Sequence, residues 1–176
     1  MFPFKQVLTT RNITPGMNTK EYIVLHHTGT PQGTLAGNLK ALTTWPVSCH
    51  FVVDGDGSAY KIGSPDMILW HAGESQWGNK KGMNSFSLGI ETIGPDFTDA
   101  QRATVRALVQ HLMAVFNIPK ENFLRHADLT NAGSAKKILW DGVSPSRKVD
   151  ISPKFWKIEP RKTWKEYQDS MVPKDL

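Results

Sequence analysis

The sequence contains one cysteine, Cys49, among 176 residues, so no internal disulfide can form. Chains without disulfides are typical of a reducing compartment. No apolar run approaches the roughly 20 residues that a membrane-spanning helix needs, so we expect no membrane span. The first residues, Met1 to Gln6, lack the charged-then-apolar order of a secretory signal peptide. We therefore expect the protein to be made in the cytoplasm.

Internal repeats, low-complexity tracts and linkers are also missing, and hydrophobic residues make up 39% of the chain. This length and composition predict a single domain over residues 1–176 with a core at about 20–158. We expect the protein to be a monomer. A polar surface arm would precede that core, and a helical tail would follow it. The net charge of +5 and the pI near 9.4 favour an anionic partner: nucleic acid, a membrane surface or an acidic cell wall.

An apolar run from Tyr22 to Leu25 leads into His26 and His27 and ends at residues typical of a turn. This pattern predicts a buried strand that places imidazoles at the rim of the core. A histidine there is often a structural, hydrogen-bonded residue. However, catalytic zinc usually has three protein ligands and one open position, and the later residues His126 and Asp150 would complete such a set with His26.

The remaining pattern predicts alternating strands and helices. We expect helices at 33–44 and 97–116, and the second begins with a capping box at Thr98 and Gln101. Strands are expected at 47–53, 58–62 and 87–94, the first two joined by a hairpin turn at 54–57. We expect a loop at 74–84, a short extended piece at 123–126, another loop at 131–146 with a turn of helix near 136–140, and a terminal helix around 164–171.

Five stretches carry a family resemblance. They are IVLHHT at 23–28, SCHFVVDGDG at 48–57, WHAG at 70–73, LGIE at 88–91, and RHAD at 125–128 followed by RKVD at 147–150. With these stretches in this order, the chain resembles the zinc-dependent N-acetylmuramoyl-L-alanine amidases of the type-2 amidase and peptidoglycan-recognition-protein family. The resemblance runs from about residue 22 to residue 155. It implies an α/β fold with a mixed central β-sheet flanked by α-helices.

The resemblance also implies a reaction, the hydrolysis of the amide between N-acetylmuramic acid and L-alanine in peptidoglycan. One Zn²⁺ per chain would be held by His26, His126 and Asp150, with Asp128 and Asp141 as alternatives for the third ligand. His27 would point to the opposite side of the strand and serve a structural role, because side chains alternate along a strand.

The resemblance assigns the remaining site residues as well. Glu91 would take the proton of the zinc-bound water and pass it to the leaving amine, and Lys148 would stabilise the oxyanion. Trp70 and His71 would bind substrate, although a packing role for His71 is an equal alternative. Cys49 stands where phage lysozyme-like members carry a catalytic tyrosine. We do not expect it to act as a nucleophile, because the metal supplies one.

The biological role that we prefer is that of a phage endolysin, a bacteriolytic and therefore antimicrobial enzyme that reaches the wall after holin-type release. Its partner would be the stem peptide and glycan of peptidoglycan, and we expect no nucleic acid. The alternatives are a bacterial enzyme of cell-wall recycling, a non-catalytic peptidoglycan-binding module, and a regulator that binds another protein.

Overall fold

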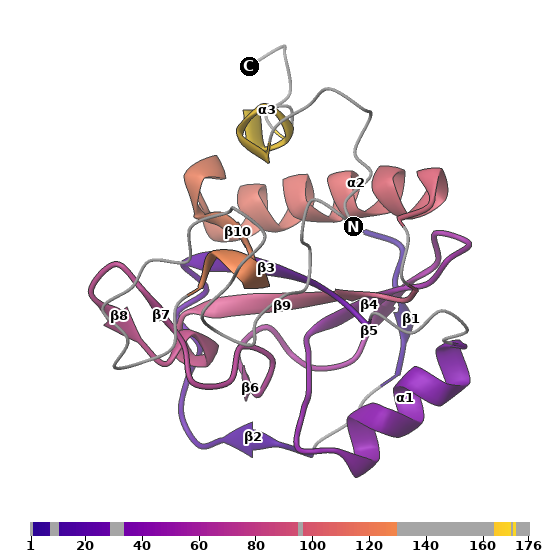
Figure 1. The fold of residues 1–176 in the computed structure, drawn as a ribbon, viewed down its shortest axis with the longest axis horizontal. Coiled ribbons are helices and arrows are strands. Elements are labelled where there is room, and N and C mark those ends of the chain that lie inside the picture. The colour runs from indigo at the N-terminus through magenta and orange to yellow at the C-terminus, as the bar shows by residue number, and fades with distance from the viewer. Residues whose placement is uncertain are drawn as a thin grey trace.

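The computed structural model describes residues 2–7, 11–28, 34–94, 97–129, 164–169 and 171. Its centre is a six-stranded sheet in the order β1-β5-β4-β9-β3-β10 (Figure 1). In that order the strands are Lys5–Gln6, Ala59–Lys61, Phe51–Val53, Ser87–Thr92, Tyr22–His27 and Phe123–Arg125. β4 and β5 are antiparallel, and the other neighbouring pairs are parallel. The predicted mixed sheet is confirmed.

Helices cover both faces of this sheet. α2, Asp99–Phe116, lies along one face, and α1, Leu35–Thr44, lies on the other (Figure 1). Ile23 and Leu25 of β3 pack in the cluster that includes α2, whereas Val24 packs in a cluster on the opposite side. The alternation along β3 therefore separates the two cores. It also places His26 on the Val24 side, away from α2.

The long helix begins and ends where its sequence signals predict. The Thr98 side chain accepts a hydrogen bond from the Gln101 backbone N–H, and the Gln101 side chain accepts one from the Thr98 N–H. The helix ends at Phe116, and the next residue, Asn117, has a φ of 54°, the left-handed conformation common after a helix. The spacing of the apolar residues predicts one buried face, made of Val105, Leu108, Leu112, Val115 and Phe116. The first three are buried and Phe116 is partly buried, but Val115 is 54% exposed, so the prediction fails at that residue.

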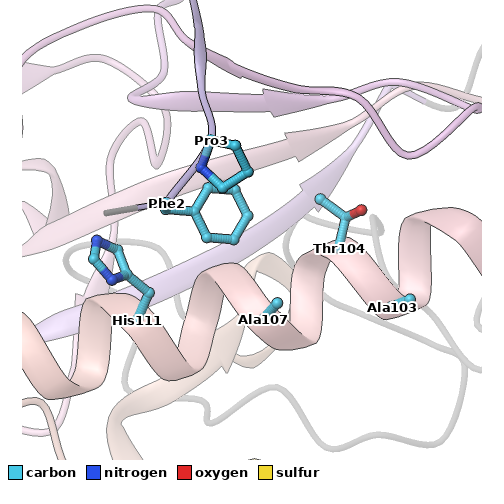
Figure 2. A pocket seen from close by; sticks show the side chains of 6 residues that line it. All are labelled: Phe2, Pro3, Ala103, Thr104, Ala107 and His111. Carbon is cyan, nitrogen blue, oxygen red and sulfur yellow. The ribbon is translucent and has the colours of Figure 1, made fainter.

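The first 20 residues differ from the predicted surface arm. β1 extends the central sheet by pairing with β5, and β2, Ile13–Thr14, pairs with β6, Ile68–Leu69. Phe4 stacks on Phe51 with ring centroids 5.2 Å apart. Phe2 and Pro3 line a hollow of about 550 Å³ together with residues of α2 (Figure 2). Two-residue strands carry no periodic signal, so the sequence pattern could not reveal this pairing.

Smaller differences concern the connections. β4 is shorter than the strand expected at 47–53. The expected loop at 74–84 contains a hairpin of β7, Gln76–Trp77, and β8, Lys80–Lys81, followed by a 3₁₀ turn at Met83–Ser85. Further 3₁₀ turns span Lys120–Asn122 and His126–Asp128, and α3 spans Trp164–Asp169. The expected features at 131–146 lie outside the described residues. Within the described ranges, no helix is long and apolar enough to cross a membrane.

Candidate active site

Three parallel strands end together at one edge of the sheet. In the register of β3 and β9, His26 lies beside Glu91. His126 directly follows β10, whose last residue, Arg125, pairs with Leu25. Segments distant in sequence thus bring two imidazoles and one carboxylate to the carboxyl ends of neighbouring strands. This edge is where open α/β sheets commonly bind ligands.

The imidazoles of this edge lie close together. The ring centroids of His26 and His126 are 4.5 Å apart, and His26 is only 3% exposed. His26 Nε2 lies 3.2 Å from Nδ1 of His71, a contact that the sequence did not predict. Asp150, Asp141 and Lys148 lie outside the described residues. Among the residues that the structure describes, no group of three potential metal ligands is gathered.

A 3₁₀ turn holds His126 in place. Its last residue, Asp128, forms an ion pair with Arg125 and also accepts a 2.8 Å hydrogen bond from the Arg125 backbone N–H. Both side chains are largely buried, and breaking a buried pair by removing one partner costs about 3–5 kcal/mol. Because Arg125 already binds its carboxylate, Asp128 serves as the anchor of this turn, which disfavours it as an alternative metal ligand.

A hollow of about 470 Å³ opens beside His126. Trp70 and His71 line it, as do Thr14, Val47 and neighbouring residues. The Trp70 indole donates a 2.9 Å hydrogen bond to Thr14 Oγ1, so β2 fixes the orientation of a ring that is 39% exposed. An oriented, accessible indole beside polar groups suits a sugar or peptide ligand. The hollow of Figure 2 lies against α2, on the opposite face of the sheet, and contains one imidazole, that of His111.

The imidazoles of His71 and His50 continue from His26 into the core, and we call these three residues the polar cluster. The rings of His50 and His71 lie 5.6 Å apart, and burial is the main cause that lowers the pKa of both. The pKa of His50 falls to about 4, and that of His71 falls well below its usual range. Both are therefore neutral at pH 7. The backbone N–H of Gly89 donates to His50 Nδ1 at 2.9 Å, which leaves Nε2 to donate to the Met67 carbonyl at 3.0 Å.

Glycine at position 89 is required by the close approach of His71. A Cβ atom there would lie 2.5 Å from Cγ of that ring, which is shorter than any ordinary contact. The Cβ atom of His71 would also lie 2.9 Å away, and rotation of the side chain does not move that atom, so turning the ring alone could not make room. A glycine in the middle of β9 therefore lets an imidazole rest on the strand.

The single cysteine is unsuited to nucleophilic chemistry. Cys49 is 1% exposed, and burial raises the pKa of its thiol well above the usual value, with a smaller contribution from the negative charge of Glu91. The reactive thiolate is therefore not formed at neutral pH.

The donor set fits a zinc ion in its chemistry. Neutral imidazole is a preferred zinc ligand, and neighbouring His26 and His126 supply two. The His26 ring is also oriented by a hydrogen-bonding neighbour, His71, as metal-binding histidines commonly are.

Comparison with known families identifies the chain. The family model described as N-acetylmuramoyl-L-alanine amidase matches residues 16–146. The chain belongs to this family. It is therefore an amidase that acts on peptidoglycan, and its matched region contains His26, Glu91 and His126.

Individual relatives agree with this assignment. The amidase is 28% identical to the 1,6-anhydro-N-acetylmuramyl-L-alanine amidase AmpD of Escherichia coli K12, over 80% of each chain. Its fold is similar to that of a selenomethionine derivative of AmpD, with a TM-score of 0.67 and 21% identity over 97% of this chain and 94% of the other. A mutant endolysin from Bacillus subtilis gives a TM-score of 0.56 and 27% identity over 70% of this chain and 84% of that one.

Sequence reasoning did not predict that Asn18 and Ser87 lie beside the buried histidines of this amidase. Asn18 is 1% exposed, and its side chain donates a 2.7 Å hydrogen bond to the backbone carbonyl of Ser87. It lies in the segment that was predicted to be a polar arm. A lone asparagine in such a segment carries no signal of burial. Ser87 likewise looks like an ordinary strand residue until His71 is placed beside it.

Proposed function

We propose that this amidase uses one zinc ion to hydrolyse the amide between N-acetylmuramic acid and L-alanine. The observation that carries the proposal is the convergence of His26, Glu91 and His126 beside the hollow lined by Trp70. His26 and His126 would hold the metal together with Asp150, as the family resemblance implies. A zinc ion so held supplies Lewis acidity and lowers the pKa of a coordinated water towards neutrality.

The protein groups then have distinct roles. Glu91 lies beside His26 on the next strand, where its carboxylate would take a proton from the attacking water and return it to the leaving amine. We assign oxyanion stabilisation to the Lys148 ammonium, on the resemblance alone. Trp70 would hold the sugar or peptide against the wall of the hollow, and His71 contributes to that wall.

Digestion of purified wall sacculi, with and without a chelator, tests this proposal. Mass analysis should find free stem peptides that begin at L-alanine, and the chelator should stop their release. Shortened glycan strands in place of these peptides would show that a different bond is cut.

Glu91→Gln should still bind zinc but lose about 10²–10⁴-fold in turnover, because it removes the proton acceptor. Unchanged turnover would remove Glu91 from the mechanism.

For the biological role, we propose that the amidase acts on the intact wall as an endolysin, after synthesis in the cytoplasm and holin-type release. The net charge of +5 supports this role because an acidic wall attracts a basic protein. The likeness to the Bacillus subtilis endolysin also supports it. The names of the AmpD relatives favour a second candidate, a recycling enzyme that acts on soluble 1,6-anhydro-muropeptides.

Paired rate measurements separate these two roles. An endolysin should release stem peptides from insoluble sacculi at a rate comparable to its rate on a soluble 1,6-anhydro-muropeptide. A strong preference for the soluble substrate, with little release from sacculi, would favour recycling and refute the endolysin role.

A further inference from the structure

The contact between His26 and His71 constrains where the protons of both rings lie. Their facing nitrogens, His26 Nε2 and His71 Nδ1, are 3.2 Å apart. Two neutral imidazoles can share such a contact only when one nitrogen carries a proton and the other presents a lone pair. The partners of the second nitrogen of His71 decide which ring donates.

That second nitrogen, His71 Nε2, faces two oxygens of Ser87. It lies 3.3 Å from the Ser87 backbone carbonyl and 3.4 Å from the hydroxyl oxygen. A carbonyl can only accept a hydrogen bond. The hydroxyl has one proton, and the Met83 carbonyl, at 2.5 Å, is the much closer acceptor for it. His71 Nε2 therefore meets two acceptors and must carry the ring proton.

With the proton on Nε2, neutral His71 presents a lone pair at Nδ1. His26 must then donate from its own Nε2, so its lone pair lies on Nδ1. We propose that His71, held by Ser87, is a positioning residue that fixes His26 in the Nε2–H tautomer and makes Nδ1 its metal-binding nitrogen. This inference rests on the proposed zinc chemistry, and it adds a role for His71 beyond lining the hollow.

The surroundings keep this chain of contacts rigid. The missing side chain of Gly89 lets the His71 ring rest on β9. Asn18 donates a 2.7 Å hydrogen bond to the same Ser87 carbonyl and so fixes the acceptor as well. Partners of this kind orient metal-binding histidines, and removing one typically lowers metal affinity or activity about 10–100-fold.

Two substitutions separate the contacts of His71. In His71→Asn, the amide oxygen can occupy the place of Nδ1, which keeps an acceptor for His26. In His71→Gln, the amide nitrogen can occupy the place of Nε2, which keeps the donor to Ser87 but loses the acceptor. We expect His71→Gln to lower zinc affinity about 10–100-fold, whereas His71→Asn should retain most of it. His111→Gln, on α2 away from the site, is the matched control and should bind zinc like the unaltered protein.

The readouts are zinc affinity, by competition with a chelating dye, and the tautomer of His26, by ¹⁵N NMR of the metal-free protein. We expect a protonated Nε2 and an unprotonated Nδ1 on His26 in the unaltered protein. A protonated Nδ1 would overturn the proposal even if neither variant folds. Equal zinc affinity in the Asn and Gln variants would also overturn it, because His71 would then act through packing alone.

These outcomes are distinct from failure of the proposed function. A protein that binds zinc and cleaves sacculi, yet carries the proton on His26 Nδ1, would refute this inference alone. A protein that does not bind zinc would refute the proposed function, whereas the tautomer would still be measurable in the metal-free state.

Discussion

Replacing His50 with asparagine should make the stability of the amidase less sensitive to acid. His50 is fully buried, and its pKa falls from an ordinary 6.5 to about 4. Above pH 6.5 the ring is neutral in both the folded and the unfolded chain. Between pH 6.5 and pH 4 the unfolded chain binds the proton first, so the free energy of unfolding decreases as the pH falls.

The two pKa values set the size of the effect. Each unit of difference corresponds to 1.36 kcal/mol, so His50 alone removes about 3 kcal/mol of stability once the pH is below 4. By pH 5 about 2 kcal/mol of this is already lost, relative to pH 7.5. A domain of this kind is stable by only about 5–15 kcal/mol, so the loss is readily measurable.

The asparagine variant removes the titrating group and keeps one of its contacts. The amide oxygen can accept the hydrogen bond that Gly89 N–H donates to His50 Nδ1. The donor to the Met67 carbonyl is lost, although Asn18 still donates to that carbonyl at 3.3 Å. We expect the variant to be about 1–3 kcal/mol less stable at pH 7.5, because a buried hydrogen bond is lost.

Urea unfolding at pH 7.5 and pH 5, in a chelator that removes the contribution of bound metal, measures the difference. The loss of stability between the two pH values should be about 2 kcal/mol smaller in His50→Asn than in the unaltered protein. His111→Asn, on the far side of the sheet, should keep the original loss. Identical losses in the unaltered protein and His50→Asn would refute the assigned pKa and the argument from burial.

Three further predictions concern stability. Gly89→Ala should lower the free energy of unfolding by about 1–3 kcal/mol, because its Cβ would overlap the His71 ring, whereas Gly55→Ala, with no atom within 4 Å of the added Cβ, should be near neutral in the same urea titration. Equal effects at the two glycines would contradict the close approach. Thr98→Ala should cost about 1 kcal/mol by removing the N-cap of α2, measured by thermal unfolding, and no change would exclude a role for the capping box. Asp128→Ala should cost about 3–5 kcal/mol in urea unfolding, because it leaves the Arg125 charge buried and unpaired. A cost below 1 kcal/mol would show that water reaches Arg125.

Local sequence signals predicted the elements that are long and regular. The capping box at Thr98 and the spacing of Val105, Leu108 and Leu112 define α2 from its own residues. The apolar run before His26 similarly defines β3. Two-residue strands such as β1 and β2 form only because they pair with a neighbouring strand. Their own residues carry no pattern that predicts this pairing.

The candidate site also combines features that the sequence predicted with features that depend on the tertiary structure. The order of the motifs, through the family resemblance that it carries, predicted that His26, Glu91 and His126 belong to one site. Only the tertiary structure decided that Glu91 lies beside His26, because the register of β3 and β9 depends on packing across the whole sheet. The approach of His71 to His26 likewise depends on a loop that rests against Gly89. Hydrogen-bond directions, and hence the positions of protons, follow from such long-range contacts, which the one-dimensional order of residues does not specify.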